Sequence, residues 1–178
     1  MAGAQNFTDL LFWQRARQWS KAVFQMTKRA AFREDRRLVE QINDSSESVG
    51  ANIAEGFGRG TQAEFVQFLG YANGSLNETQ SQLCAAYDRE YITKDEFARL
   101  FEEGTEIRKM MVGFITSMVR SGSGVKHMQK TMSWSEEVWQ RYERITGRQR
   151  PEMFRPKPDD EDGPKRMLRP PRDDRAPF

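Results

Sequence analysis

The sequence predicts an all-α fold: an antiparallel, up-down-up-down four-helix bundle, followed by a fifth C-terminal helix and a disordered tail. All seven prolines lie at or after Pro151, so the first 150 residues lack the strongest helix breaker. Within those residues, apolar side chains recur at steps of four and three along four long segments joined by short turns, which is typical of a bundle. No segment has the alternating pattern of a half-buried strand.

The first predicted helix covers residues 8–31, and the second starts after Asp35, a candidate N-cap, and continues to about Phe57. The apolar stripe of the first helix comprises Phe12, Ala16, Trp19, Val23, Met26 and Ala30. That of the second comprises Leu38, Ile42, Ser45, Val49, Ile53 and Phe57. Each stripe keeps one side of its helix apolar.

The third and fourth helices begin with the same signal, a threonine followed three positions later by a glutamate, which predicts a capping box. These pairs are Thr61 with Glu64 and Thr93 with Glu96. The two stripes that follow comprise Phe65, Leu69, Ala72, Leu76, Thr79, Leu83 and Ala86, and then Phe97, Leu100, Gly104, Ile107, Met111, Phe114 and Met118. Gly70 and Gly74 cost helix stability, which predicts the close approach of a neighbouring helix there.

We therefore divide the chain into a bundle at 1–121, a linker and short helix at 122–150, and a disordered, proline-rich charged tail at 151–178. The short helix is predicted by a further capping-box spacing, Ser133 with Glu136, and by a glycine stop at Gly147. "RPPR" at 169–172 is compatible with polyproline II.

The sequence offers little for catalysis, metal binding or a small-molecule substrate. The only histidine, His127, lies beyond the four helices, so a di-iron site is excluded, and no cofactor is expected. The single cysteine, Cys84, occupies a core position and is interpreted as a small buried hydrophobe. With one cysteine, no apolar run long enough to span a membrane and no leader-like N-terminus, the chain is expected to be cytoplasmic.

Basic residues gather on the first helix although the net charge of the chain is only +2. Residues 8–37 hold eight Lys or Arg against three Asp or Glu, a local net charge of +5. The candidate phosphate-binding residues are Arg15, Arg17, Lys21, Lys28 and Arg29. The alternative is an ordinary solvated helix face. Residues 122–150 are also basic, with six positive charges against three negative ones.

Polar residues of the segment "ANIAEGFGRG" at 51–60 allow more than one interpretation. Glu55 and Arg59 are four apart, so they can pair on an exposed face, and Gly58 or Gly60 can end the helix. A phosphate-binding loop is disfavoured because these glycines follow a helix rather than a strand. A third interpretation is a polar network that fixes helix register, comprising Asn52, Glu55, Arg59, Ser75 and Glu78.

Several large apolar residues lie off the core stripes, which predicts a second buried surface between protomers, and hence a homo-oligomer. They are Phe7, Leu10, Leu11, Trp13, Phe24, Val66, Phe68 and Tyr71.

Four segments closely resemble the four-helix-bundle proteins encoded in intervening sequences of bacterial 23S ribosomal RNA genes. They are "FTDLLFWQRARQWSKAVFQMT" (7–27), "SVGANIAEGFGR" (48–59), "EFVQFLGYANGSLNET" (64–79) and "YITKDEF" (91–97). That fold family includes Avd, the accessory protein of diversity-generating retroelements. The resemblance covers about residues 7–121 and implies a ring-like homopentamer. For the Avd branch it implies binding to a reverse transcriptase and its RNA, without catalysis.

Two departures from the family pattern bear on function. Gly50 replaces a usual proline, and Asn43 and Asp44 replace usual basic residues, which removes positive charge from the second helix. The first hypothesis is a non-enzymatic, oligomeric, cytoplasmic bundle that binds nucleic acid or a reverse transcriptase. The alternative is a protein-binding ring scaffold with no nucleic-acid role.

Overall fold

The computed structural model describes residues 4–120 and 136–149. Its elements are two 3-10 turns, η1 (Phe7–Asp9) and η2 (Ala30–Phe32), and the helices α1 (Leu11–Thr27), α2 (Arg36–Gly58), α3 (Gln62–Asp88), α4 (Lys94–Arg120) and α5 (Glu136–Thr146). The described residues contain helices and no strand, which confirms the predicted all-α class and the fifth helix. The predicted linker at 121–135 and the predicted tail lie outside the described residues.

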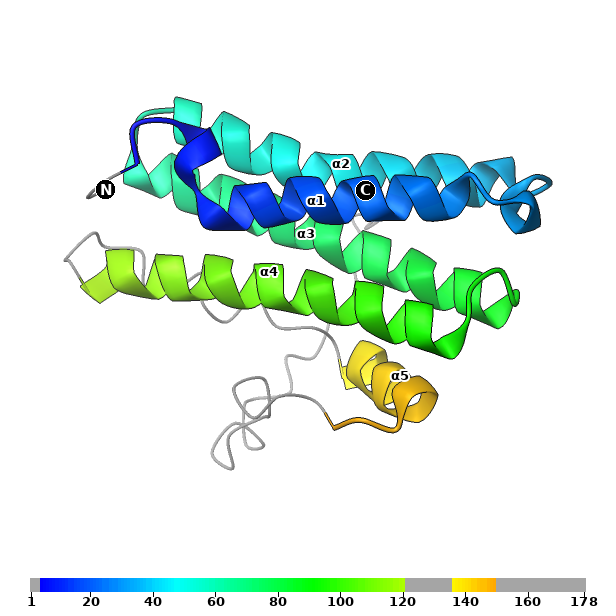
Figure 1. Ribbon diagram of the computed structural model, residues 1–178. Helices are drawn as coiled ribbons and strands as arrows, with labels where there is room; N and C mark the ends of the chain where they lie inside the picture. The colour runs from blue at the N-terminus through cyan, green and yellow to red at the C-terminus, as the bar shows by residue number, and fades with distance from the viewer. Residues whose placement is uncertain (1–3, 121–135, 150–178) are drawn as a thin grey trace, which may run out of the picture.

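The four long helices are antiparallel to their neighbours in sequence (Figure 1). α1 packs on α2, α2 on α3, α3 on α4, and α4 closes the bundle by packing back on α1. α5 lies outside this arrangement, against α4 (Figure 1). The apolar stripes therefore meet in a single core, as the 4,3 spacing requires.

The first helix is shorter than predicted at both ends. Before it, the backbone amides of Gln5 and Asn6 both donate to Asp9 Oδ2 at 2.9 Å, which holds the chain in the η1 turn. After Thr27 the chain turns through η2, which buries Phe32 and leaves Ala30 exposed. A large aromatic gains more from burial than an alanine does, so Phe32 determines how the connection folds.

The predicted helix starts are confirmed by their side-chain hydrogen bonds. Asp35 Oδ1 accepts from the Leu38 amide at 3.3 Å, and Thr61 Oγ1 accepts from the Glu64 amide at 3.2 Å. In the reciprocal box that starts α4, the Thr93 amide donates to Glu96 Oε2 at 3.0 Å. Each such cap stabilises its helix by about 1 kcal/mol.

The core is built from the predicted stripes and contains large side chains from all four helices. Fully buried examples are Trp19, Phe32, Ile42, Ile53, Phe65, Leu69, Leu76, Leu83, Phe97 and Phe101. Trp19 also donates from Nε1 to the Leu100 carbonyl at 2.8 Å, which ties α1 to α4. Since a buried indole N–H needs an acceptor, this bond fixes the relative position of the two helices.

Close helix approach occurs at Gly56 and Gly104, and not at Gly74. A Cβ added at Gly56 would collide with the Cβ of Phe68, and one at Gly104 would lie 2.8 Å from Gln80 Nε2. At Gly74, by contrast, a Cβ would meet nothing within 4 Å, so the prediction for this position is wrong. Gly60 has φ +82° and ends the α2 segment, in agreement with the prediction of a left-handed glycine there.

Candidate nucleic-acid interface

The outward side of α1 carries a stripe of four exposed residues, Arg17, Lys21, Phe24 and Lys28, which we call the α1 stripe. Their spacing of 4, 3 and 4 places them on one side of the helix. The opposite side carries the buried core residues of α1. Phe24 is 41% exposed, and Lys28 Nζ lies 4.3 Å from the centroid of its ring. The stripe therefore combines three cations with an accessible aromatic ring.

α1 contains no Asp or Glu between Leu11 and Thr27. Its cations consequently lack the acidic neighbours, three or four positions away, with which helical residues usually pair. Within residues 4–120 and 136–149, neither Arg15 nor any cation of the α1 stripe forms an ion pair. Their charge remains available to an external anion.

Arg15 and Arg17 lie on different sides of α1. Arg15 lines a groove of about 290 Å³ between α1 and α4, which also contains the carboxylates of Glu103 and Glu106. Arg17 lines a groove of about 370 Å³ between α1 and α2, whose walls include Phe7 and Trp13. These two rings meet edge to face at 4.9 Å. Arg15 is thus separated from the α1 stripe and lies in a more acidic setting.

Arg29, the fifth candidate from the sequence, is engaged within the protein. Its Nη1 lies 2.5 Å from Glu96 Oε1. The pKa of Glu96 is lowered, mainly by the hydrogen bond from the Thr93 backbone amide and further by Arg29. Arg29 therefore links the connection after α1 to the start of α4, whereas its neighbour Lys28 faces solvent.

Of the residues proposed as a polar network, the structure brings only two into contact across helices. Asn52 Nδ2 approaches Ser75 Oγ at 3.4 Å and donates to the Ser48 carbonyl at 2.8 Å. Glu55 and Arg59 instead pair with each other on the surface, as the simplest interpretation of their spacing predicts.

Glu78, the remaining member of the proposed network, accepts from Gln82 within α3. Gln82 also belongs to a buried cluster that joins α2 to α3, in which Ser45 Oγ lies 2.8 Å from Thr79 Oγ1 and 2.7 Å from Gln82 Oε1. The inter-helix polar contact therefore centres on Ser45, about two turns of α2 before Asn52.

A second buried polar cluster, unanticipated from the sequence, surrounds Arg108 of α4. Its fully buried guanidinium donates to Asn77 Oδ1 and, at 3.1 Å, to Gln80 Oε1. Gln80 in turn donates to the Phe101 carbonyl at 2.8 Å. Burial lowers the pKa of Arg108. The signal in the sequence was the polar series Asn73, Asn77 and Gln80, whose 4,3 spacing matches that of a core-facing stripe.

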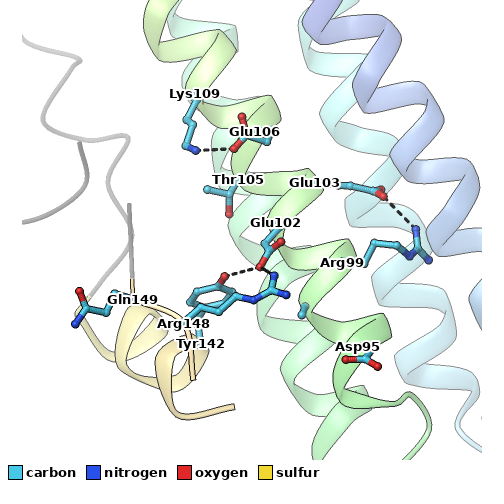
Figure 2. Close-up of a pocket in the computed structure, with 11 residues that line it drawn as sticks. Asp95, Arg99, Glu102, Glu103, Thr105, Glu106, Lys109, Tyr142, Arg148 and Gln149 are labelled. Carbon is cyan, nitrogen blue, oxygen red and sulfur yellow. Dashed lines mark hydrogen bonds and ion pairs between the residues drawn. The ribbon is translucent and has the colours of Figure 1, made fainter. Parts of the chain in front are cut away.

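The charges between α4 and α5 are mostly paired. A pocket of about 610 Å³ lies there, with Glu102 at its centre (Figure 2). Glu102 Oε1 accepts from Tyr142 Oη at 2.8 Å and also from Arg148 (Figure 2). Along α4, Arg99 pairs with Glu103 at 3.1 Å and Lys109 with Glu106 at 2.5 Å. This pocket is thus lined largely by charges that neutralise one another.

Tyr142 anchors α5 on the bundle. Its ring is buried and stacks on Phe101 with centroids 4.8 Å apart and planes 19° from parallel. Burial and the hydrogen bond to Glu102 raise the pKa of Tyr142 to about 12. The hydroxyl therefore stays protonated and remains a donor throughout the physiological range.

The off-stripe apolar residues divide into three groups. Leu10 and Val66 are buried within the protomer, so they offer no second surface. Phe7, Trp13 and Phe68 are half-buried. Leu11, Phe24 and Tyr71 are 59%, 41% and 50% exposed. The prediction of a second apolar surface thus rests on fewer residues than the sequence suggested.

The described residues contain no cluster of three or more His, Cys, Asp or Glu side chains arranged to hold a metal ion. Cys84 is buried, and burial raises the pKa of its thiol to about 11, which suppresses the nucleophilic thiolate. None of the described helices is long and apolar enough to cross a membrane. His127 lies outside the described residues.

Comparison with known proteins agrees with the bundle architecture. A family model described as the 23S rRNA-intervening sequence protein matches residues 8–113, more than half of the chain. The matched segment contains α1, α2, α3 and most of α4, and ends before α5. No curated protein and no solved structure shows significant similarity to the chain. The chain belongs to the 23S rRNA-intervening sequence protein family.

Proposed function

We propose that this protein is a non-enzymatic accessory bundle that binds RNA through the α1 stripe. The observation that carries the proposal is the set of exposed cations on a helix without a single carboxylate, with an exposed phenyl ring among them. Cations that neutralise phosphates supply most of the affinity in non-specific nucleic-acid binding. An aromatic ring beside them gives unpaired bases a surface on which to stack.

The charge composition of α1 favours RNA binding over the alternative that the α1 stripe is an ordinary solvated helix face. A solvated face usually mixes acidic and basic residues, as α4 does with its two intrahelical pairs. On α1, by contrast, every charged side chain is positive. Because phosphates are spaced regularly along RNA, cations repeated along a helix can contact several of them at once.

Assembly would strengthen such binding. The exposed Leu11 and Tyr71 support the proposal that the protein forms a homo-oligomer. Several copies of the α1 stripe on one particle would act together on a long RNA, so that weak individual contacts add up to tight binding. A reverse transcriptase that carries such an RNA is the protein partner that this function suggests.

The test compares two variants with the same loss of charge. The first replaces the unpaired cations of α1 (Arg15→Gln, Arg17→Gln, Lys21→Gln, Lys28→Gln). The second replaces four cations that pair with carboxylates (Arg59→Gln, Arg89→Gln, Arg99→Gln, Lys109→Gln). Affinity for a structured RNA with single-stranded loops is measured by fluorescence anisotropy at about 50 mM salt.

We expect the first variant to bind at least tenfold more weakly than the unmodified protein, and the second to stay within about threefold, because paired cations have little charge to offer. Equal losses in both variants would show that net charge alone matters and would refute a role for the α1 stripe. If the unmodified protein does not bind, the nucleic-acid role fails and a protein-binding scaffold takes its place.

A further inference from the structure

We propose that α5 carries a second RNA-binding surface, which the bundle holds in reserve by pairing its arginines with carboxylates of α3 and α4. This inference rests on the proposed function and adds a form of regulation to it. The arginines concerned are Arg141 and Arg148, which pair with Asp88 and Glu102 respectively. RNA phosphates and these carboxylates would compete for the same guanidinium groups.

The first argument is the arrangement of charge on α5. Arg141 and Arg144 are three positions apart on one side of the helix, and Arg148 lies two residues beyond its end. Gly147, with φ +72°, ends the helix just before Arg148. All three arginines are exposed. Freed from the bundle, the end of α5 and Arg148 would offer three guanidinium groups to RNA, beside the carboxylate of Glu143.

The second argument is that the ion pairs are accessible to a competitor. The side chains of Arg141 and Asp88 are 44% and 47% exposed, and those of Arg148 and Glu102 are 61% and 39% exposed. Exposed pairs are weak because water solvates both partners. Guanidinium groups bind phosphate oxygens in the same forked geometry as carboxylates, so an RNA phosphate can replace either carboxylate without loss of hydrogen bonds.

The third argument is that α5 has a small anchor. Apart from these pairs, its described buried side chains are those of Tyr142 and Thr146, with Ile145 packed partly against the core. Glu102 holds α5 in two ways, because it accepts a hydrogen bond from Tyr142 Oη, which anchors the helix, and also pairs with Arg148. Losing the carboxylate contacts would therefore loosen the helix as well as free its arginines.

Attachment of α5 to the bundle and binding of its arginines to RNA thus oppose each other. Because only molecules with these arginines free can bind RNA through them, a change that raises the free fraction should raise the apparent RNA affinity, up to the affinity of the fully open state. The bundle without its carboxylate partners should consequently bind RNA more tightly than the unmodified protein. α5 lies beyond the segment matched by the family model.

The test uses the full chain and a double substitution, Asp88→Asn with Glu102→Gln. Its matched control, Glu90→Gln with Asp95→Asn, removes two carboxylates at the same end of the bundle that form no ion pair with a described residue. The first variant should bind the structured RNA about three- to tenfold more tightly than the control. Without RNA, hydrogen–deuterium exchange of the α5 amides should also be faster in the first variant than in the control.

A third variant adds Arg141→Gln and Arg148→Gln to the first. It should lose the gain in affinity while keeping the fast α5 exchange, because the helix is loose but its arginines are gone. Equal RNA affinity of the first variant and its control would overturn the proposal. That outcome is distinct from failure of the α1 stripe, which the four α1 substitutions report on their own: if those lower affinity and Asp88→Asn/Glu102→Gln changes nothing, only the reserve surface is refuted.

Discussion

α1 and α4 are both long amphipathic helices that contact each other, yet they use their charged residues in opposite ways. On α4, Arg99 and Lys109 have acidic partners four and three positions away and pair with them. On α1, the cations have no acidic residue along the helix and no ion pair with a described residue. Both helices carry Lys and Arg, but the neighbouring residues in the sequence decide whether these cations form ion pairs within the protein.

The spacing of opposite charges within a segment therefore predicts which cations are available to an external anion better than the net charge of the segment does. Residues 94–120 contain five Lys or Arg and five Asp or Glu, a net charge of zero, and much of that charge is paired. α1 contains fewer cations, but all of them remain exposed. Arg29, one residue after the exposed Lys28, is an exception to this local rule, because the fold brings it to Glu96 of another helix.

The largest effect is expected at the aromatic ring of the α1 stripe. Phe24→Ala should weaken binding to single-stranded RNA by about 1–3 kcal/mol, roughly 5- to 150-fold, because a stacked base loses its platform. Gln25→Ala is the matched control, since Gln25 is the exposed neighbour of Phe24 on α1 but has no aromatic ring. Anisotropy titrations of both variants decide the matter. Equal effects of the two substitutions would remove Phe24 from the interface.

A smaller effect should follow when α4 is made to resemble α1. Glu103→Gln with Glu106→Gln removes the partners of Arg99 and Lys109 and the carboxylates that share a groove with Arg15. We expect RNA affinity to rise about threefold to tenfold at low salt, as released cations gain access to phosphates. The control is again Glu90→Gln with Asp95→Asn. Unchanged RNA affinity would mean that the ion pairs on α4 do not prevent Arg99 and Lys109 from binding phosphates.

The paired cation Arg29 should matter for stability rather than for RNA. Because the folded-state pKa of Glu96 is lowered from 4.5, its stabilising contribution is fully present above that value and is lost as the pH falls through the lower folded pKa. Arg29→Gln should reduce this acid-dependent loss and cost about 0.5 kcal/mol at neutral pH. Denaturant unfolding between pH 3 and pH 7 measures both. Lys28→Gln should leave the pH profile unchanged, and a profile altered equally by both substitutions would contradict the assignment.

The smallest effect is expected at the intrahelical pair Arg99–Glu103, whose side chains are 54% and 41% exposed. A double-mutant cycle on the free energy of unfolding should give a coupling of about 0.3–0.5 kcal/mol. The value should decrease in high salt. A coupling free energy well above 1 kcal/mol would contradict this expectation and show that the Arg99–Glu103 pair contributes substantially to the stability of the fold.

Much of the fold could be predicted from the sequence because bundle helices depend on local signals. The threonine–glutamate pairs at 61–64 and 93–96 cap α3 and α4 as their spacing predicts. The 4,3 apolar stripes likewise place the core. The length of α1 could not be predicted, because burial of Phe32 after the helix is a tertiary effect that no local pattern shows.

The candidate interface was predictable in part. The sequence locates the basic helix, but the partner of Arg29 lies 67 positions along the chain, so only the fold could pair it with Glu96. Phe24 was assigned to an apolar surface because hydrophobicity alone does not distinguish a protein contact from a base-stacking ring. The buried Arg108 was missed for a related reason, since arginine is rarely placed in a core and its partners Asn77 and Gln80 belong to another helix.

The most direct test of the central claim is a salt titration of RNA binding by the unmodified protein, followed by fluorescence anisotropy between about 50 and 200 mM salt. If the cations of the α1 stripe neutralise phosphates, log affinity should fall linearly with log salt. Three contacts would weaken binding roughly thirtyfold over this range, and six or more contacts, as in an oligomer, about a thousandfold. An affinity independent of salt, or no binding at the lowest salt concentration, would contradict the account.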